Sequence, residues 1–480
     1  MPLILPGNVG SATAATGYDV ANSCRFNDGD SAYMHKTPGG AGTSADLFTF
    51  SMWIKRGIIS SSDRIVLFYA QSDAQNFDRI SFTDADVLEW KGVRSDSQAF
   101  NLTTSQVFRD ISSWYHLHFI WDSADSTADN RMRIYVNGTQ VTAFGTRANP
   151  SSGLDAIIGS AQKHSVGSTG SSGTYYDGYM AEVVYLDGQE LTPDGNTGEF
   201  DEDSGIWKPI DVSGLTFGNN GFYLEFKESG TGTNASGMGA DTSGNTNHFA
   251  VNNLTAIDQS TDTCTNNFAT LNPLDKLYNG GTFTEGNLKV VTADSIYGAV
   301  TSTIGINSGK WYAEFKATDA GRDFAMVGIK STPATGNGDG VGANDGYAYY
   351  SYNGKKVHGG TETAYGDTYD DGDIIGVAVD LDNNKIYWSK NGTFQNSGDP
   401  TTGSTGTGSA YDLDAPPSGF YFFSVSHEDN ADGGTWEANF GSPPYAISSG
   451  NTDGNGYGNF EYAVPSGYYA LNTKNLAEYG

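Results

Sequence analysis

The stretch GDIIGVAVDLDNNKIYWSKNG (372–392) decides what kind of fold this sequence encodes. Its apolar runs at 374–379 and 385–390 are separated by Asp and Asn residues, whose side chains favour turns by bonding nearby backbone. The Asn-Gly pair that follows is the one a type I′ hairpin turn prefers, because both residues tolerate positive φ. The stretch therefore predicts antiparallel strands joined by tight turns.

The same pattern occurs much earlier in the chain, as RMRIYVNGTQV (131–141). Alternation of apolar and polar residues in FTFSMWIKRG (48–57) predicts another strand. WYHLHFIWD (114–122) is apolar on both faces, which is typical of a central strand between packed layers. No segment shows sustained helical periodicity, so we expect an all-β protein.

Composition agrees with several β domains and excludes some functions. The chain has 480 residues, which gives a prior of roughly two to four domains, and its 63 Gly predict many turns. The formal net charge of −30 repels nucleic acid and anionic membrane surfaces. We therefore expect no nucleic-acid partner and no membrane insertion.

Cysteine usage and the first residues bear on the compartment. Cys24 and Cys264 lie far apart in the sequence, which predicts neither a disulfide framework nor a zinc site. The first residues have no basic segment followed by a signal-type apolar run. We expect a protein made in a cytoplasm that leaves the cell, if it leaves, by another route.

The order of the early strands resembles the laminin-G-like branch of the concanavalin A-like jelly rolls. The resemblance covers roughly residues 21–195 and implies an antiparallel sandwich of two sheets. Its motifs are SCRFNDGDSAYM (23–34), FTFSMWIKR (48–56), WYHLHFIWD (114–122), MRIYVNGTQV (132–141) and YDGYMAEVVYLDGQELT (176–192).

The later part of the chain resembles the SPRY domain, whose fold is also a two-sheet sandwich. GKWYAEF (309–315), the opening stretch and ANFGSPP (438–444) carry this resemblance. The sequence thus predicts two jelly-roll sandwiches joined by a turn-rich connector. The expected parts are an N-terminal arm (1–20) that docks onto a particle, a laminin-G-like domain (21–195), a connector with extra strands (196–283), a SPRY-like domain (284–445) and a C-terminal tail (446–480).

Candidate catalytic acids lie in GEFDEDSG (198–205), where Glu199, Asp201 and Asp203 alternate. Laminarinase-like glycosidases carry alternating acids on a strand of the same fold, and a retaining pair works about 5 Å apart. The flanking residues here are turn formers, which favours a solvated loop. We therefore expect no catalytic residues and a protein that is not an enzyme.

Candidate metal ligands are few. His116 and His118 share one strand face, but a metal site needs a third ligand, so a packed, hydrogen-bonded pair is favoured. Asp380, Asp382 and Asn384 imitate the start of a calcium loop but lack its glycine and its closing glutamate. These three residues are better explained as a hairpin turn.

Calcium stays open as a cofactor, although none is certain. The segments NDGD (27–30) and DTYDDGD (367–373) offer oxygen ligands for weak Ca²⁺ binding. The laminin-G-like resemblance also implies calcium binding, because many such domains bind it. No full ligand set maps onto this chain, so the metal ligands are left unassigned.

Tyrosines near glycine-rich loops are the candidate ligand contacts. Exposed tyrosine rings stack on sugars or anchor peptides, whereas alternating tyrosines in a strand more often form a packed face. The SPRY resemblance implies binding through loops at one edge of the sandwich. The candidates are Tyr347, Tyr349, Tyr350 and Tyr352 after the loop at 335–346, and Tyr175 and Tyr176 after GSTGSSG (167–173).

The combination of the two domains resembles a group of structural proteins of tailed bacteriophages, especially marine ones. The resemblance implies a tail fibre, a tail-associated protein or a capsid fibre or decoration protein, exposed on the outside of the virion. Its implied partners are other virion proteins, further copies of itself and a glycan or protein on the host surface. The alternatives are a purely particle-stabilising role and an enzyme acting on polysaccharide.

Overall fold

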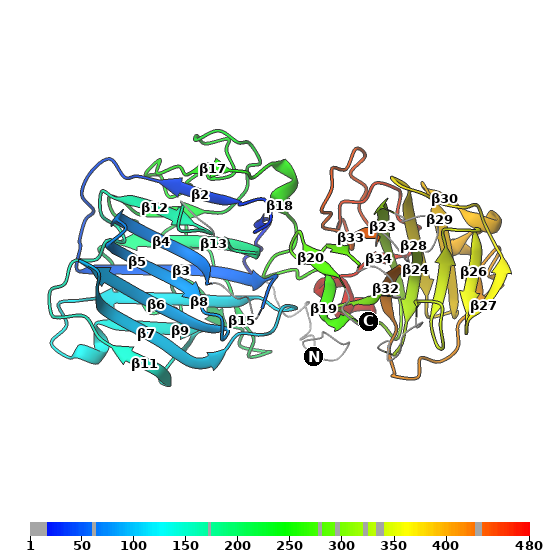
Figure 1. The fold of residues 1–480 in the computed structure, drawn as a ribbon, viewed down its shortest axis with the longest axis horizontal. Helices are drawn as coiled ribbons and strands as arrows, with labels where there is room; N and C mark the ends of the chain where they lie inside the picture. Colours follow the sequence, from blue (N-terminus) through cyan, green and yellow to red (C-terminus); the bar gives the residue numbers. More distant parts are fainter. Residues whose placement is uncertain are drawn as a thin grey trace. The chain divides into compact units, whose positions relative to one another are not determined.

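The computed structural model describes residues 17–59, 64–170, 174–276, 281–292, 298–319, 325–332, 340–427 and 434–480. Most of the expected N-terminal arm (1–20) lies outside these ranges. The chain forms two compact units, one ending at Thr265 and the other running from Asn266 to Gly480. Strands dominate both units, so the all-β prediction is confirmed (Figure 1).

The first unit contains two antiparallel sheets, here called sheets A and B. Sheet A runs in the order β10-β9-β8-β3-β13-β1-β18, with β16 paired to β13. Its strands are β1 (Ser23–Phe26), β3 (Leu47–Arg56), β8 (Tyr115–Asp122), β9 (Met132–Val136), β10 (Thr139–Gln140), β13 (Gly178–Asp187), β16 (Phe222–Leu224) and β18 (Gln259–Ser260).

Sheet B runs in the order β11-β7-β6-β5-β4-β12-β2-β17, and Figure 1 shows most of these strands side by side in one layer. Its strands are β2 (Tyr33–Lys36), β4 (Ile65–Asp73), β5 (Asn76–Phe82), β6 (Val87–Arg94), β7 (Ser97–Val107), β11 (Phe144–Ala148), β12 (Lys163–Val166) and β17 (Ala250–Asn252). Outside both sheets, β14 (Glu199–Phe200) pairs with β15 (Trp207–Lys208).

The core of this unit lies between sheets A and B, where aromatic side chains such as Phe50, Trp90 and Phe119 are buried. A second apolar layer covers the outer face of sheet A, with Trp53 and Trp207 buried in it. The strand at 114–122 therefore lies between packed layers, as its two apolar faces predict.

The expected connector at 196–283 is divided between the two units. Strands β16, β17 and β18 pair with β13, β2 and β1, so the chain up to Thr265 completes the first sandwich. The remainder belongs to the second unit, where β19 (Leu271–Lys276) and β20 (Thr282–Thr284) lie. The boundary expected from sequence was wrong because these short strands carry little pattern of their own and are held by pairing with distant strands.

The second unit also contains two sheets, C and D. Sheet C runs β19-β22-β32-β24-β25-β26-β27, and sheet D runs β20-β21-β33-β23-β28-β29-β30. Strands of sheet C are β19 (Leu271–Lys276), β22 (Gly298–Ser302), β24 (Ala325–Lys330), β25 (Tyr347–Tyr350), β26 (Lys355–His358), β27 (Thr361–Ala364) and β32 (Phe422–His427). Strands of sheet D are β20 (Thr282–Thr284), β21 (Lys289–Val291), β23 (Lys310–Asp319), β28 (Ile374–Asp380), β29 (Lys385–Lys390), β30 (Thr393–Phe394) and β33 (Thr435–Asn439), with β31 (Tyr411–Asp412) paired to β29.

The C-terminal segment at 446–480 is mostly irregular but packed. Strand β34 (Tyr469–Ala470) pairs in parallel with β23, and the helix α1 (Thr473–Tyr479) follows. Leu471 and Leu476 belong to the core of the second unit. Among the described residues, no helix is long and apolar enough to cross a membrane.

The two Asn-Gly hairpins are built alike. Asn137 and Asn391 both have φ of 47°, and the following glycines have φ of 75° and 79°. The Asn137 carboxamide accepts the His116 N–H at 2.8 Å, and the Asn391 carboxamide accepts the Ile374 N–H at 2.9 Å. Each asparagine thus ties its turn to the neighbouring strand. The repeated sequence therefore forms the same type of hairpin turn in both sandwiches.

Candidate functional site

Three of the six candidate tyrosines lie fully inside the fold. Tyr176 is 0% exposed and donates its hydroxyl to the Lys55 carbonyl at 2.8 Å. In β25, Tyr347 stacks on His358 at 4.1 Å, and Tyr349 packs against Trp388. These rings have no face left for a ligand, so the ligand-contact expectation is wrong for them and the packed-face alternative holds.

The remaining three tyrosines differ in exposure. Tyr350 is 5% exposed and packs in a small apolar cluster with Met326 and Val357, so it is also excluded as a ligand platform. Tyr175 is half-buried beside Tyr33. Tyr352 is 54% exposed and is the one candidate that presents an open ring. The reason is that β25 is a central strand covered on both faces, and Tyr352 lies beyond its end.

The two histidines form the expected packed pair. Trp207 donates its indole N–H to His116 Nδ1 at 3.0 Å, so His116 Nε2 carries the proton and donates to Ser51. His118 Nε2 donates to the Leu191 carbonyl at 2.8 Å. Burial lowers the pKa of His118 to about 4 and also holds the pKa of His116 well below its usual value, so both rings are neutral and already fully bonded.

The acidic segment at 199–203 forms a short hairpin rather than a catalytic strand. Lys208 contacts both Glu199 and Asp201, at 3.2 and 3.1 Å. Hydrogen bonds from the backbone and hydroxyl of Ser204, joined by the Lys208 contact, hold the pKa of Asp201 at about 2. Asp201 therefore stays ionised and is unsuited to the role of a general acid.

The residues that imitate a calcium loop form a turn, as expected. Asp380 is buried, accepts the Asn383 N–H at 3.0 Å and pairs with Lys310 at 2.9 Å. Asp382 accepts the Gly309 N–H at 3.0 Å. Within the described ranges there is no group of three or more His, Cys, Asp or Glu side chains placed to hold a metal ion. Cys24 and Cys264 are free thiols.

A polar pocket on the first unit was not expected from the sequence. It has a volume of about 450 Å³, within the range of small-molecule sites. Its walls come from the segment before β1, from β13 and from the chain between β15 and β17. The lining residues that matter for its chemistry are Tyr18, Asp19, Glu182, Asp211, Glu225 and Lys227.

Glu182 is the buried acid of this pocket. It lies at an irregularity in the pairing of β13 with β3, where its φ is 51°, and only 5% of the residue is exposed. Tyr223 and Tyr18 both donate their hydroxyls to its carboxylate, and the two hydroxyls lie 2.8 Å apart. Burial and the nearby Glu225 charge raise the pKa of Glu182 to about 7 despite the two hydroxyl donors.

The sequence does contain one indication of this site. Glu182 interrupts the apolar run YMAEVVYL (179–186), and a charged residue in the middle of a buried strand needs a partner. Its partners are Tyr18 and Tyr223, which lie far away in sequence. Glu314, in WYAEFKA (311–317), is a second case, and its carboxylate accepts the Tyr462 and Glu461 N–H groups.

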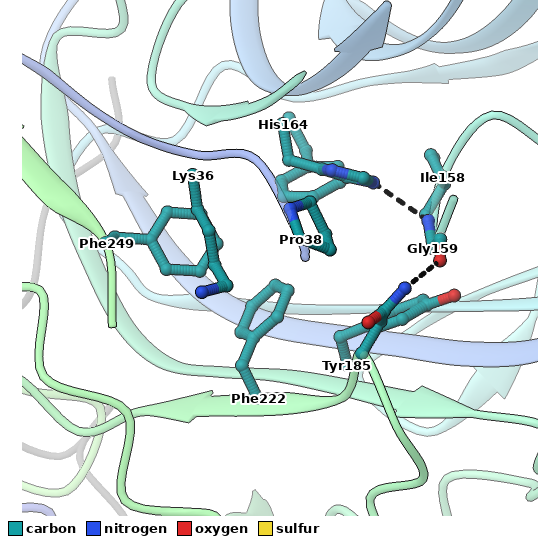
Figure 2. A pocket seen from close by; sticks show the side chains of 10 residues that line it. Lys36, Pro38, Ile158, Gly159, His164, Tyr185, Phe222 and Phe249 are labelled. Atoms are coloured by element: carbon teal, nitrogen blue, oxygen red, sulfur yellow. Dashed lines mark hydrogen bonds between the residues drawn. The ribbon is translucent and has the colours of Figure 1, made fainter. Parts of the chain in front are cut away.

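A second cavity, inside the first unit, is too small for a ligand. Figure 2 shows Lys36, His164, Tyr185 and Phe222 pointing toward it. Its volume is about 10 Å³, close to the least that holds one water molecule. His164 Nε2 accepts the Gly159 N–H at 2.8 Å, so this ring nitrogen is bonded within the fold.

Comparison with known proteins separates the two units by family. Residues 28–194 match the model of the concanavalin A-like lectin/glucanases superfamily, and residues 310–407 match that of the SPRY domain.

Three solved structures are similar to parts of the chain. The SPRY domain of human HERC1 is 18% identical, with a TM-score of 0.28, over 35% of this chain and 96% of its own. A SAP-like pentraxin from Limulus polyphemus is 15% identical, with a TM-score of 0.28, over 42% and 100%. A candidate carbohydrate-binding protein from Bacteroides ovatus is 15% identical, with a TM-score of 0.32, over 49% and 59%. The two family matches show that the chain contains a laminin-G-like region of the concanavalin A-like lectin/glucanases superfamily at residues 28–194 and a SPRY region at residues 310–407.

Proposed function

We propose that this protein is a non-enzymatic adhesion component of a bacteriophage particle that binds glycans or proteins on the host surface. The observation that carries the binding role is the open polar pocket on the lectin-type unit, which has the volume of a small-ligand site. Proteins of this kind fold in the host cytoplasm and act outside it. Many copies on one symmetric particle raise the avidity of weak individual contacts.

The strong negative charge supports this role. A net charge of −30 keeps a densely displayed protein soluble and discourages contact with the nucleic acid inside a particle. Glu199 and Asp201, the candidate catalytic acids, both pair with Lys208, and Asp201 is ionised. A purely particle-stabilising protein would share the charge but would have no use for an open polar pocket.

The location is tested on purified particles. Mass spectrometry of particles from the phage that encodes this chain should detect it in fixed proportion to the major capsid protein. Deleting residues 1–16 should abolish its incorporation, while Tyr18 and Val20, which pack on the first unit, are kept. Particles that lack the chain, or normal incorporation of the truncated chain, would each refute part of this proposal.

The host-binding role is tested separately with the purified full chain. A glycan array and a whole-cell binding assay should give binding that depends on the host strain. Absence of binding in both assays would leave the particle-stabilising role in its place.

An enzyme acting on polysaccharide is a second candidate, favoured by one observation. Glu182 has a pKa of about 7 and shares its pocket with Glu225, and a raised carboxyl beside a second one is the pattern of a glycosidase acid pair. Release of reducing sugar from host polysaccharide by the wild type, lost in Glu182→Gln, would establish this candidate. Because two tyrosine hydroxyls already donate to Oε2 of Glu182 and the residue is buried, we expect no release.

A further inference from the structure

The pocket around Glu182 belongs to this chain rather than to the domain family it contains. Of the residues that line it, only Glu182 falls within the family match at 28–194. The segment before β1 forms one wall, and the chain from Asp211 to Lys227 forms much of the rest. We infer that this pocket is a carbohydrate site that binds a sugar unit carrying no acidic group. The inference deepens the adhesion role proposed above and rests on it.

The wall formed by the N-terminal segment is held in place by specific bonds. The Tyr18 hydroxyl lies 2.8 Å from that of Tyr223, and the Val20 N–H donates to Thr265 Oγ1 at 3.1 Å. Val20 is buried in the outer apolar layer with Trp53. A wall fixed in this way needs little further ordering when a ligand binds, which favours affinity.

The chemistry of the lining suits the hydroxyl groups of a sugar. Asp19 and Asp211 are exposed carboxylates that accept hydrogen bonds, and a sugar hydroxyl donates them. Glu225 also accepts and is paired with Lys227 at 2.5 Å, which supplies a donor beside it. Tyr18 is half-buried and adds an aromatic surface of the kind on which sugar rings pack.

The charges of the lining select against acidic sugars. Asp19, Asp211 and Glu225 outnumber the single cation Lys227. Hydrogen bonds from Ser213 lower the pKa of Asp211, so it stays ionised down to acidic pH. A uronic acid or a sulfated sugar would place a further negative charge among these groups, and like charges repel in a partly enclosed site.

Glu182 acts as a positioning residue in this site. Its carboxylate accepts from both tyrosine hydroxyls, so it fixes the Tyr18 ring that forms the wall. Replacing it with Gln keeps the shape and removes the charge. Replacing Tyr18 with Phe keeps the ring and removes the hydroxyl, and replacing Tyr18 with Ala removes both.

The test uses the full chain and saturation-transfer NMR with titration. The probes are cellobiose, maltose and N,N′-diacetylchitobiose as neutral sugars and digalacturonic acid as the acidic one. We expect at least one neutral probe to bind and the acidic one to bind at least about tenfold more weakly. The double variant Asp211→Asn, Glu225→Gln should lose about tenfold or more in affinity for the neutral probe.

Matched variants separate the pocket from a general surface effect. Tyr18→Ala should abolish sugar binding. Tyr18→Phe should keep most of the sugar binding. Tyr18→Phe and Glu182→Gln, each as a single variant, should both shift the pH dependence of the affinity. Glu228→Gln, an exposed acid outside the lining, and Tyr352→Ala, on the second unit, should bind as the wild type does. Thermal melts of each variant confirm that it is folded.

The outcomes distinguish this inference from the adhesion role. Binding of neutral sugars that survives the pocket variants but is lost in Tyr352→Ala would overturn the pocket and leave the adhesion role standing. Equal or tighter binding of digalacturonic acid would overturn the selectivity. Strain-dependent binding to cells with no binding of any sugar probe would overturn the inference alone, and absence of both would overturn the adhesion role as well.

Discussion

Substituting Asn391 in the hairpin of the opening stretch should destabilise the second unit by a predictable amount. Its φ of 47° is left-handed, which costs a residue such as Ala about 1 kcal/mol or more. Its carboxamide also accepts the Ile374 N–H at 2.9 Å, a bond with a net contribution of about 1 kcal/mol. Asn391→Ala should therefore lower the free energy of unfolding by about 2–3 kcal/mol. Asn391→Gly should lower it by about 1 kcal/mol, because glycine adopts positive φ without strain but still lacks the hydrogen bond.

The assay is thermal unfolding of the full chain together with hydrogen exchange measured by mass spectrometry. For a unit of this size, about 2–3 kcal/mol lowers the midpoint by roughly 5–10 °C. Exchange should speed up in peptides of β28 and β29, while peptides of β8 and β9 in the other unit serve as the internal control. Equal losses for the Ala and Gly variants would refute the φ argument, and no loss in either would refute the role of the hairpin.

Three further predictions follow from burial and from the pKa shifts. Tyr347→Ala should lower the free energy of unfolding by about 3–5 kcal/mol because the ring is buried, whereas Tyr352→Ala should lower it by less than about 0.5 kcal/mol. Comparable losses for the two variants in urea unfolding would contradict the assignment of Tyr347 as buried and Tyr352 as exposed. The pKa of His118 is about 4 in the fold against 6.5 when free, so the stability contributed by its neutral ring should be lost as pH falls from 6.5 to 4. A melting point that stays flat over this range would count against this. Burial raises the pKa of Glu314 from 4.5 to about 7, so the stability contributed by its protonated form should be lost as pH rises through 7. Glu314→Gln should therefore flatten the fall of the melting point between about pH 5 and 8. An unchanged slope would disprove this.

The hairpins and strands could be predicted because their information is local. The Asn-Gly pairs at 137–138 and 391–392 specify positive φ by themselves, and the alternation in 48–57 specifies a strand with two faces. The turn at Asp380 is equally local, since its carboxylate bonds the Asn383 N–H three residues later. The family of each unit followed from the order of such elements.

The exposure of the tyrosines could not be predicted in the same way. Tyr349 and Tyr352 both lie in one tyrosine-rich stretch, yet one is 0% and the other 54% exposed. The difference arises because β24 and β26 flank β25 and the core covers it, while Tyr352 lies past the last paired residue. The pairing of strands, rather than the residue type, decides which ring can meet a ligand.

By itself, the sequence of this protein determined what short-range physics controls, namely the strands, their Asn-Gly hairpins and a strongly acidic surface, while its resemblance to two families implied the two jelly-roll sandwiches. Only the tertiary structure decided that residues 196–265 complete the first sandwich, and that Tyr18, Glu182 and Tyr223 meet beside one pocket. The physical reason is that an isolated buried carboxylate is unfavourable, so Glu182 depends on hydroxyl donors that distant parts of the chain supply. Pairing of β16 with β13 places Tyr223 beside Glu182, and packing of the segment before β1 places Tyr18 there, so no local pattern in the sequence records these contacts.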